Sequence, residues 1–224
     1  VELLAIDADG VRFSPTTGWG SPGPISPTIF ILDTPPQLVL DAAGNVIATW
    51  RDTIGKVWTN RFTAGQWGSA ALLDTTNNSN YEPQIAMASN GVATAVWAAF
   101  VQPPSGAAYT VIRASRTSSA TSAWSSPVAL NVPGSDATDA QPQVATDANG
   151  NAAAVWRQTV ATDVHQLWAS RYLASANAWS KPERLDKAAA DAALDRPQIA
   201  MDASGNAIAV WVQYTIVGNN TRTD

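Results

Sequence analysis

The sequence contains no cysteine, a single histidine and no long apolar run. Without cysteine among the 224 residues, neither disulfide bonds nor thiolate metal sites can form. A single histidine, His165, excludes a metal site built from several imidazoles. No apolar run approaches the roughly 18 residues that a membrane-spanning helix requires. We therefore expect no membrane span, no metal and no other cofactor.

Charge is also scarce, since charged residues make up 14% of the sequence and hydrophobic residues 46%. Such a composition excludes an intrinsically disordered chain. The formal net charge is −5, and no basic patch is visible, so we expect no nucleic-acid partner. The absence of cysteine fits a secreted bacterial protein, and a start at Val1 fits a processed or excised segment. We therefore expect a secreted or cell-surface location.

One line of sequence recurs four times, beginning with Pro-Gln and ending on tryptophan. The copies are PQLVLDAAGNVIATW from Pro36, PQIAMASNGVATAVW from Pro83, PQVATDANGNAAAVW from Pro142 and PQIAMDASGNAIAVW from Pro197. Their starts lie 47, 59 and 55 residues apart. These intervals are near the length of a four-stranded propeller blade and exceed that of leucine-rich or ankyrin repeats.

Each repeat divides into four short segments separated by turn residues. Asp-x-x-Gly-Asn joins the first two segments at Asp41, Asp147 and Asp202, and an Asx residue followed by glycine is typical of a tight hairpin. The second segment ends on a tryptophan in every repeat: Trp50, Trp97, Trp156 and Trp211. The third segment holds an apolar residue followed by arginine. The fourth opens on another tryptophan: Trp67, Trp124 or Trp179.

The second segment is apolar on both of its faces. Its residues alternate with a period of two, which indicates a β-strand with tryptophan and small residues on one face. The other face holds residues such as Ile47 and Val155. A strand that is apolar on both faces is covered on both sides, as a propeller blade is by its two neighbours. We therefore predict an all-β fold, a β-propeller of four-stranded antiparallel blades.

The two ends of the sequence predict one composite blade. The repeats span about 36–74, 83–131, 142–186 and 197–224, whereas residues 1–30 have no Pro-Gln unit. Phe13 and Trp19 match the third and fourth segments, which are incomplete in the last repeat. We expect a single domain over residues 1–224 with four blades, one of them closed by both termini. Two alternatives stay open: the chain is part of a larger propeller, or two chains complete one another as a homo-oligomer.

With its Asp-x-x-Gly-Asn turns and Pro-Gln repeats, the chain resembles secreted bacterial β-propeller repeat proteins over its whole length. The turns are similar to the Asp-box hairpins of sialidase-like propellers and of lectin-type propellers. They depart from that pattern, because the order Ser-x-Asp-x-Gly-x-Thr-Trp is not present. The resemblance implies the propeller fold, and a fold by itself does not carry an activity.

No catalytic cluster is visible in the sequence. The resemblance to sialidases implies an arginine triad, a tyrosine nucleophile and an acid/base aspartate. The recurring Arg61, Arg116 and Arg171 occupy equivalent positions, so we expect them spread around the ring, each near an acid. His165 lies in a stretch that does not repeat, and no nucleophile motif accompanies it. We therefore predict that the chain is not an enzyme.

Two tryptophans stand outside the positions that recur in every blade. Trp58 and Trp168 occupy equivalent sites in the third segment, where the remaining whole repeat has Arg113. A position that accepts arginine is expected to be partly exposed. We therefore predict that Trp58, Trp168 and Arg113 form a ligand-binding surface, with the indoles stacking on a sugar ring.

Four glutamines follow the prolines that open the repeats: Gln37, Gln84, Gln143 and Gln198. If the first segment is the innermost strand, these amides ring the mouth of a central channel. They either hold a small ligand or satisfy one another and the backbone by hydrogen bonding, and the sequence favours the second.

The composition and the repeats together predict a non-catalytic extracellular binding module. We expect it to bind carbohydrate in a lectin-like manner, since identical weak sites on one ring gain avidity. The alternatives are a structural or assembly propeller with a protein partner and, less favoured, a glycoside hydrolase. A hydrolase would need two carboxylates flanking the scissile bond, and many acids are candidates for them.

Overall fold

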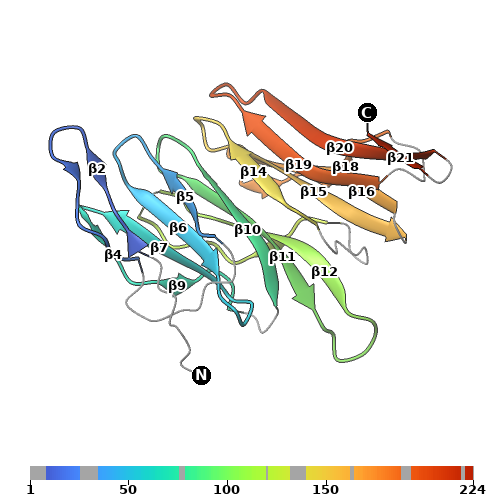
Figure 1. Ribbon diagram of the computed structural model, residues 1–224, viewed down its shortest axis with the longest axis horizontal. Helices are drawn as coiled ribbons and strands as arrows, with labels where there is room; N and C mark the ends of the chain where they lie inside the picture. Colours follow the sequence, from blue (N-terminus) through green and yellow to red (C-terminus); the bar gives the residue numbers. More distant parts are fainter. Residues whose placement is uncertain are drawn as a thin grey trace.

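The computed structural model describes residues 9–25, 35–75, 79–119, 121–131, 140–161, 164–187, 193–217 and 220–223. Every regular element in these ranges is a β-strand, and every strand pair is antiparallel. The predicted all-β architecture is confirmed. The sheets follow one another along an arc from the N-terminal to the C-terminal end (Figure 1). None of the described residues belongs to a helix long and apolar enough to cross a membrane.

Three sheets contain the full set of strands and are called the first, second and third blades. The first consists of β5 (Gln37–Leu40), β6 (Val46–Arg51), β7 (Val57–Thr63), β8 (Gln66–Trp67) and β9 (Ala71–Leu72). The second consists of β10 (Asn80–Met87), β11 (Ala93–Val101), β12 (Tyr109–Arg116) and β13 (Val128–Ala129). The third consists of β14 (Gln143–Thr146), β15 (Ala152–Ala161), β16 (Val164–Leu173), β17 (Ala178–Trp179) and β18 (Glu183–Arg184).

Partial sheets stand at the two ends of the arc. The fourth blade has β19 (Ala193–Met201), β20 (Ala207–Val217) and β21 (Asn220–Thr223). The N-terminal half-blade pairs β1 (Asp9–Gly10) with β4 (Gly23–Pro24), and β2 (Phe13–Ser14) with β3 (Gly18–Trp19). Parts of the N-terminal unit expected over residues 1–30 lie outside the described residues. The blade number and the composite blade therefore stay predictions.

The first strands of the four blades form the inner edge of the arc. β10 contacts β5 on one side and β14 on the other, and β14 contacts β19. Along each first strand the Pro-Gln pair lies toward one end, and the hairpin turn to the second strand lies at the other. The blades consequently have a Pro-Gln end and a turn end, and equivalent residues of successive blades lie at the same end.

In the first three blades, the tryptophan within the second strand packs against the preceding sheet. Trp97, fully buried, meets Val57 and Leu73 of the first blade, and Trp156 meets Val96 and Ile112 of the second. Trp50 packs against Ile25 of the N-terminal half-blade. A buried tryptophan removes some 150–250 Å² from water, so these repeated contacts are the main attachment between blades.

The Asp-x-x-Gly-Asn hairpins are confirmed. Asp41 Oδ1 accepts the backbone N–H of Ala43 and of Asn45, both at 2.9 Å, and Oδ2 accepts the Asn45 amide at 2.7 Å. Gly44 between them has φ 81°, which glycine adopts without steric cost. The same three bonds recur at Asp147 and Asp202.

Two of the recurring arginines bridge neighbouring blades by lying over aromatic rings. The guanidinium of Arg61 lies 5.7 Å from the ring centre of Trp124, and that of Arg116 lies 3.7 Å from that of Tyr172. Arg116 is buried, and burial lowers its pKa. The expectation that each arginine head lies near an acid is met by Arg171, whose Nε is 3.9 Å from Glu183.

Candidate functional site

Strained backbone recurs at the Pro-Gln end of three successive first strands. Glu82, Gln141 and Arg196 have φ of 50°, 45° and 51°, and each directly precedes the proline of its repeat. At Glu82 and Arg196 the pairing with the second strand shifts register, which marks a β-bulge. Proline cannot donate a ladder hydrogen bond, so it favours such a break in the sheet. A left-handed conformation in a residue other than glycine is unfavourable by about 1–3 kcal/mol and clusters at active sites and ligand clamps.

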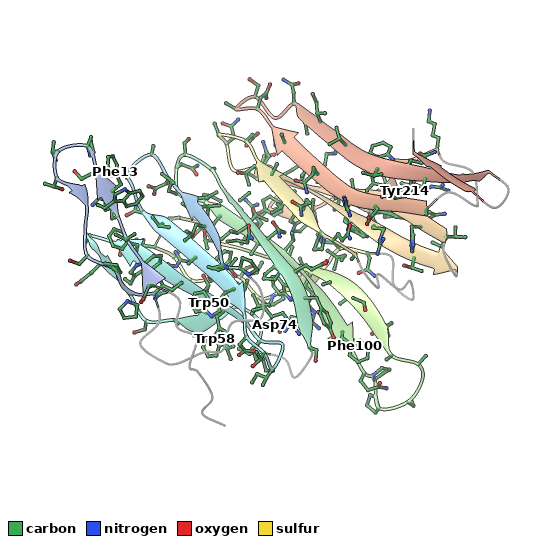
Figure 2. All side chains as sticks on the ribbon, viewed as in Figure 1. Phe13, Trp50, Trp58, Asp74, Phe100 and Tyr214 are labelled. Atoms are coloured by element: carbon green, nitrogen blue, oxygen red, sulfur yellow. The ribbon has the colours of Figure 1, made fainter. Side chains whose placement is uncertain are left out.

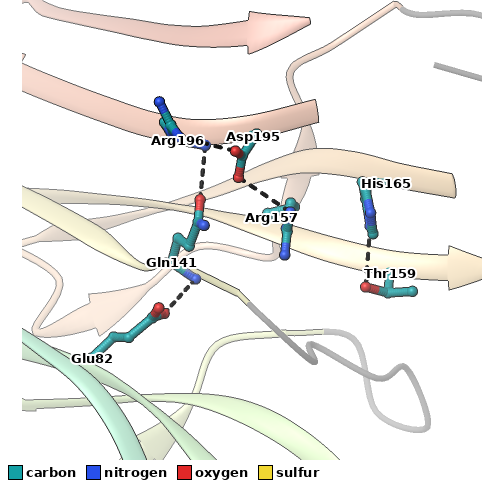
Figure 3. Close-up of polar contacts among 7 residues, drawn as sticks. All are labelled: Glu82, Gln141, Arg157, Thr159, His165, Asp195 and Arg196. Atoms are coloured by element: carbon teal, nitrogen blue, oxygen red, sulfur yellow. Dashed lines mark hydrogen bonds and ion pairs between the residues drawn. The ribbon is translucent and has the colours of Figure 1, made fainter. Parts of the chain in front are cut away.

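The side chains of these bulge residues reach from blade to blade. The carboxylate of Glu82 accepts the backbone N–H of Gln141 at 2.9 Å, and the Gln141 side-chain oxygen accepts that of Arg196 at 2.7 Å (Figure 3). Glu82 and Gln141 thereby each hold the equivalent residue of the next blade. The result is a polar chain along the inner edge from the second to the fourth blade.

Ion pairs extend this chain at the fourth blade. Asp195 Oδ1 accepts a hydrogen bond from Arg157 Nη1 at 3.2 Å, and its Oδ2 lies 3.4 Å from Arg196 Nε. The side chains of Asp195 and Arg157 are 22% and 12% exposed, whereas that of Arg196 is 75% exposed. The guanidinium of Arg196 is therefore exposed to solvent beside the carboxylate of Asp195, which Arg157 and Arg196 hold in place. We call Glu82, Gln141, Arg157, Asp195 and Arg196 the bulge cluster.

Other polar groups lie at the same end of the blades. Arg51 lies over the ring of Tyr81, 4.9 Å from its centre, and donates to the carbonyl of Asn80. In the third blade, His165 Nδ1 and Thr159 Oγ1 are 3.2 Å apart. His165 belongs to β16 and lies opposite Thr159 of β15. In Figure 3 it stands on the side of Arg157 that is away from Gln141. The only histidine of the sequence thus stands beyond the bulge cluster, on the third blade.

The bulge cluster can perform acid–base chemistry and bind anions. It contains two carboxylates, Glu82 and Asp195, and glycosidic-bond cleavage uses a pair of carboxyl groups. Arg196 can form a bidentate pair with a carboxylate or sulfate of a ligand. Among the described residues, no three His, Cys, Asp or Glu side chains are grouped so that they could hold a metal ion.

A cleft of about 450 Å³ lies at the opposite, turn end, between the second and third blades. Arg116, Trp124, Asn149 and Tyr172 contribute to its wall. The guanidinium of Arg116 is already bonded to Thr94 and to the Gly150 carbonyl. None of the described residues that line this cleft is an aspartate or a glutamate.

The ligand-stacking candidates from the sequence lie in three separate blades. Trp58, labelled in Figure 2, belongs to the first blade and is half-buried. Its indole N–H donates to Asp52 at 2.8 Å. Trp168 is half-buried and donates to Gln166 at 3.1 Å. Arg113 is 18% exposed and forms an ion pair of 2.8 Å with Asp74. They occupy equivalent positions, paired with the second strands. A role in ligand stacking stays a prediction.

The four glutamines lie on the inner strands, Gln37 and Gln143 at the first residue of β5 and β14, and Gln84 and Gln198 within β10 and β19. Gln37, Gln84 and Gln143 are paired with Thr49, Val96 and Val155, on the face that the following blade covers, and Gln198 is paired with the exposed Val210. Directly paired residues share a face, so Gln37, Gln84 and Gln143 also face the following blade and are half-buried. Gln198 of the fourth blade is exposed. Their role at a channel mouth stays a prediction.

The sequence interpretation missed the bulge cluster because its members differ in type from blade to blade. Glutamate, glutamine and arginine hold the equivalent position before proline, so no motif repeats there. A signal was nevertheless present. Charged or amide residues precede Pro83, Pro142 and Pro197, at the start of the strands expected to be innermost.

The fold is shared with known β-propeller enzymes, although no family model and no curated protein matches the sequence. The Hadza microbial sialidase Hz136 matches with a TM-score of 0.52 and 12% identity over 84% of this chain and 45% of its own. A polysaccharide lyase, the PL25 ulvan lyase, matches at 0.56 and 11% over 84% and 51%. The α-L-arabinanase of Penicillium chrysogenum matches at 0.55 and 13% over 88% and 63%. This chain therefore has a sialidase-like propeller fold and spans about half the length of these structures.

The prediction of a non-catalytic, lectin-like or structural module, and with it the statement that the chain is not an enzyme, is wrong. The solved structures that share the fold are a sialidase, a polysaccharide lyase and an arabinanase. The physical reason lies in how a propeller builds a site. Residues that differ in type stand at the equivalent position of successive blades, next to the inner strands, so a search for a motif that repeats does not find them.

Proposed function

We propose that this chain belongs to a propeller enzyme that cleaves glycosidic bonds of a polysaccharide, with the bulge cluster as its catalytic face. The observation that carries the proposal is the hydrogen-bonded chain of strained residues from Glu82 through Gln141 to Arg196, which ends on the ion-paired Asp195. Stored strain at three equivalent points is typical of a functional site. The carbohydrate-active enzymes that share the fold support the same reaction class.

The two carboxylates divide the work of hydrolysis. Glu82 is exposed, and its protonated form donates a proton to the oxygen of the leaving sugar. Asp195, held by Arg157 and Arg196, accepts a proton from the water that attacks the anomeric carbon. One water is consumed, the bond between the anomeric carbon and the glycosidic oxygen breaks, and solvent restores both carboxyl groups.

The exposed guanidinium of Arg196 favours a substrate with acidic sugars. Arginine binds carboxylate and sulfate through two parallel hydrogen bonds. A polysaccharide is too large to enter a cell intact, so secretion of the enzyme follows as part of the proposal. The proposal also includes that residues 1–224 form a single domain.

The test is turnover of defined polysaccharides. The chain is incubated with neutral arabinans, sialylated glycans and uronate-containing polymers, and new reducing ends are counted. We expect Glu82→Gln and Asp195→Asn each to lower the rate at least about a hundredfold, as loss of a catalytic acid or base does. Arg196→Ala is expected to raise KM on acidic polymers more than on neutral ones, and to lower kcat on both because Arg196 also holds Asp195.

Glu183→Gln is the matched control, because Glu183 is an exposed glutamate on β18 and pairs with an arginine. Its activity should equal that of the parent chain. Circular dichroism before each assay shows that the variants are folded. The proposal fails if no polymer gives new reducing ends, or if turnover survives both carboxylate changes.

A further inference from the structure

The fourth blade exposes a face that is buried in each of the other three. Ile208 and Val210 of β20 are 73% and 56% exposed. Their equivalents are at most 4% exposed: Ile47, Thr49, Thr94, Val96, Ala153 and Val155. In the inner blades this face is covered by the tryptophan face of the following blade. The fourth blade therefore has an uncovered copy of an interface that the structure forms repeatedly.

The opposite end of the arc exposes the complementary face. Leu38 and Leu40 of β5 are 60% and 69% exposed, on the face that Trp50 shares. The counterparts of Leu38 in the next two blades, Ile85 and Val144, pack in clusters with residues of the preceding blade. The N-terminal half-blade covers Trp50 through Ile25 but not these two leucines. Each end of the arc thus shows one half of the blade-to-blade contact.

The N-terminal half-blade consists of the outer strands of a blade. Phe13 pairs with Trp19, as Phe62 pairs with Trp67 and Tyr172 with Trp179. The three ring pairs have the same edge-to-face geometry, with centres 5.3, 5.5 and 5.6 Å apart. Within the described ranges, residues 9–14 pair only with β3 and β4, so a second strand is missing beside them.

Among the described residues, the fourth blade has no strand at the place that this half-blade would fill. β21 pairs with β20 only from Tyr214 to Val217. In the described part of the chain, no strand pairs with the outer edge of β20 between Ala207 and Gln213. An unpaired edge of this length is a template for another strand.

We propose that two copies of this chain associate head to tail, and that residues 9–14 of one copy pair with β20 of the other. The first blade fixes the register, because Val46 pairs with Phe62 and Trp50 with Trp58. By equivalence, Ala207 lies opposite Phe13, Ala209 opposite Val11, and Trp211 opposite Asp9. Ile208 and Val210 of one copy then cover Leu38 and Leu40 of the other. This assembly does not require that Glu82 or Asp195 be catalytic.

The partner is a second copy because the N-terminal half-blade and the fourth blade of one chain lie far apart. Phe13 and Tyr214 mark opposite ends of the arc in Figure 2. The arc also matches parts of two solved structures that are about twice its length. Closing four blades on themselves would change every blade-to-blade angle, and close-packed tryptophan contacts resist such a change.

The first experiment measures the mass of the full chain by sedimentation velocity over a range of concentrations. The parent chain should associate, and the exposed-face double variant Ile208→Lys/Val210→Lys should weaken association by at least about tenfold. The control Val128→Lys changes a valine that is 45% exposed on the outer strand of the second blade, and it should not alter association. A parent chain that stays monomeric at every concentration overturns the proposal. The faces would then belong to further blades of a longer polypeptide.

The second experiment tests the register by disulfide cross-linking. Because the sequence has no cysteine, only the introduced thiols can react. Val11→Cys is mixed with Ala209→Cys and oxidised, and a covalent dimer is expected on a non-reducing gel. The control mixture uses Ile208→Cys, which is more exposed but on the other face of β20. Equal or faster cross-linking of the control overturns the predicted pairing, as does failure of the Ala209→Cys mixture to cross-link.

Discussion

Replacing Trp156 by alanine tests whether the repeated tryptophans attach one blade to the next. Trp156 is fully buried and lies in a cluster with Val96, Ile112 and Ala154. Loss of about 150 Å² of apolar contact at about 25 cal/mol per Å² destabilises the fold by about 4 kcal/mol. That value lies within the range of about 3–5 kcal/mol for Trp→Ala in a core.

The equivalent change in the fourth blade, Trp211→Ala, allows the loss of stability to be compared within the same protein. Trp211 occupies the same place in its repeat but is only half-buried, so Trp211→Ala should cost about 2 kcal/mol by the same area argument. Urea unfolding followed by circular dichroism, on dilute protein to keep it monomeric, measures both free energies. A loss below about 1 kcal/mol for Trp156→Ala, or equal losses for the two variants, would refute the packing argument.

Three further changes test the blade contacts and the turns. Arg116→Lys should lower the free energy of unfolding by about 1–2 kcal/mol in urea titrations, because lysine cannot lie flat on the Tyr172 ring, and no loss would contradict the stacking. Ala64 has φ 53° in a hairpin turn, so Ala64→Gly should raise the melting temperature through relief of about 1 kcal/mol of strain, and a lower one would contradict it. Burial alone would raise the pKa of Asp41, but hydrogen bonds from Asn45 and the turn backbone outweigh it and hold the pKa below 3.8. Its stabilisation is therefore complete well above pH 3.8 and is lost as the pH falls through the lower folded pKa. The stability advantage over Asp41→Asn should shrink on acidification, and an advantage independent of pH would contradict this.

The turns and the strand order could be read from the sequence because they depend on local chemistry. The hairpin at Asp41 needs an Asx side chain that accepts nearby N–H groups and a glycine at positive φ, and both are visible in the sequence. The alternation of tryptophan with small residues likewise predicted which strand is covered on both faces. Repetition made these signals strong, since each was present several times.

The partners of individual side chains depended on which blade lies next. The heads of Arg61 and Arg116 lie over Trp124 and Tyr172 of the following blade, contacts that the sequence did not predict. The indole of Trp58, expected at a surface for sugar stacking, donates to Asp52. Sequence spacing does not reveal contacts across a blade interface, because they join residues far apart in the chain.

The repeat alone determined the all-β architecture, the hairpins and the tryptophan face of each blade, since these follow from local backbone chemistry and period-two burial. Only the tertiary structure placed Glu82, Gln141 and Arg196 in one hydrogen-bonded chain and joined Asp195 to Arg157. It also showed that Ile208 is exposed where Ile47 is buried. Such differences arise from what stands beside a residue in space, and equivalent positions in a repeat have different neighbours at the ends of an arc.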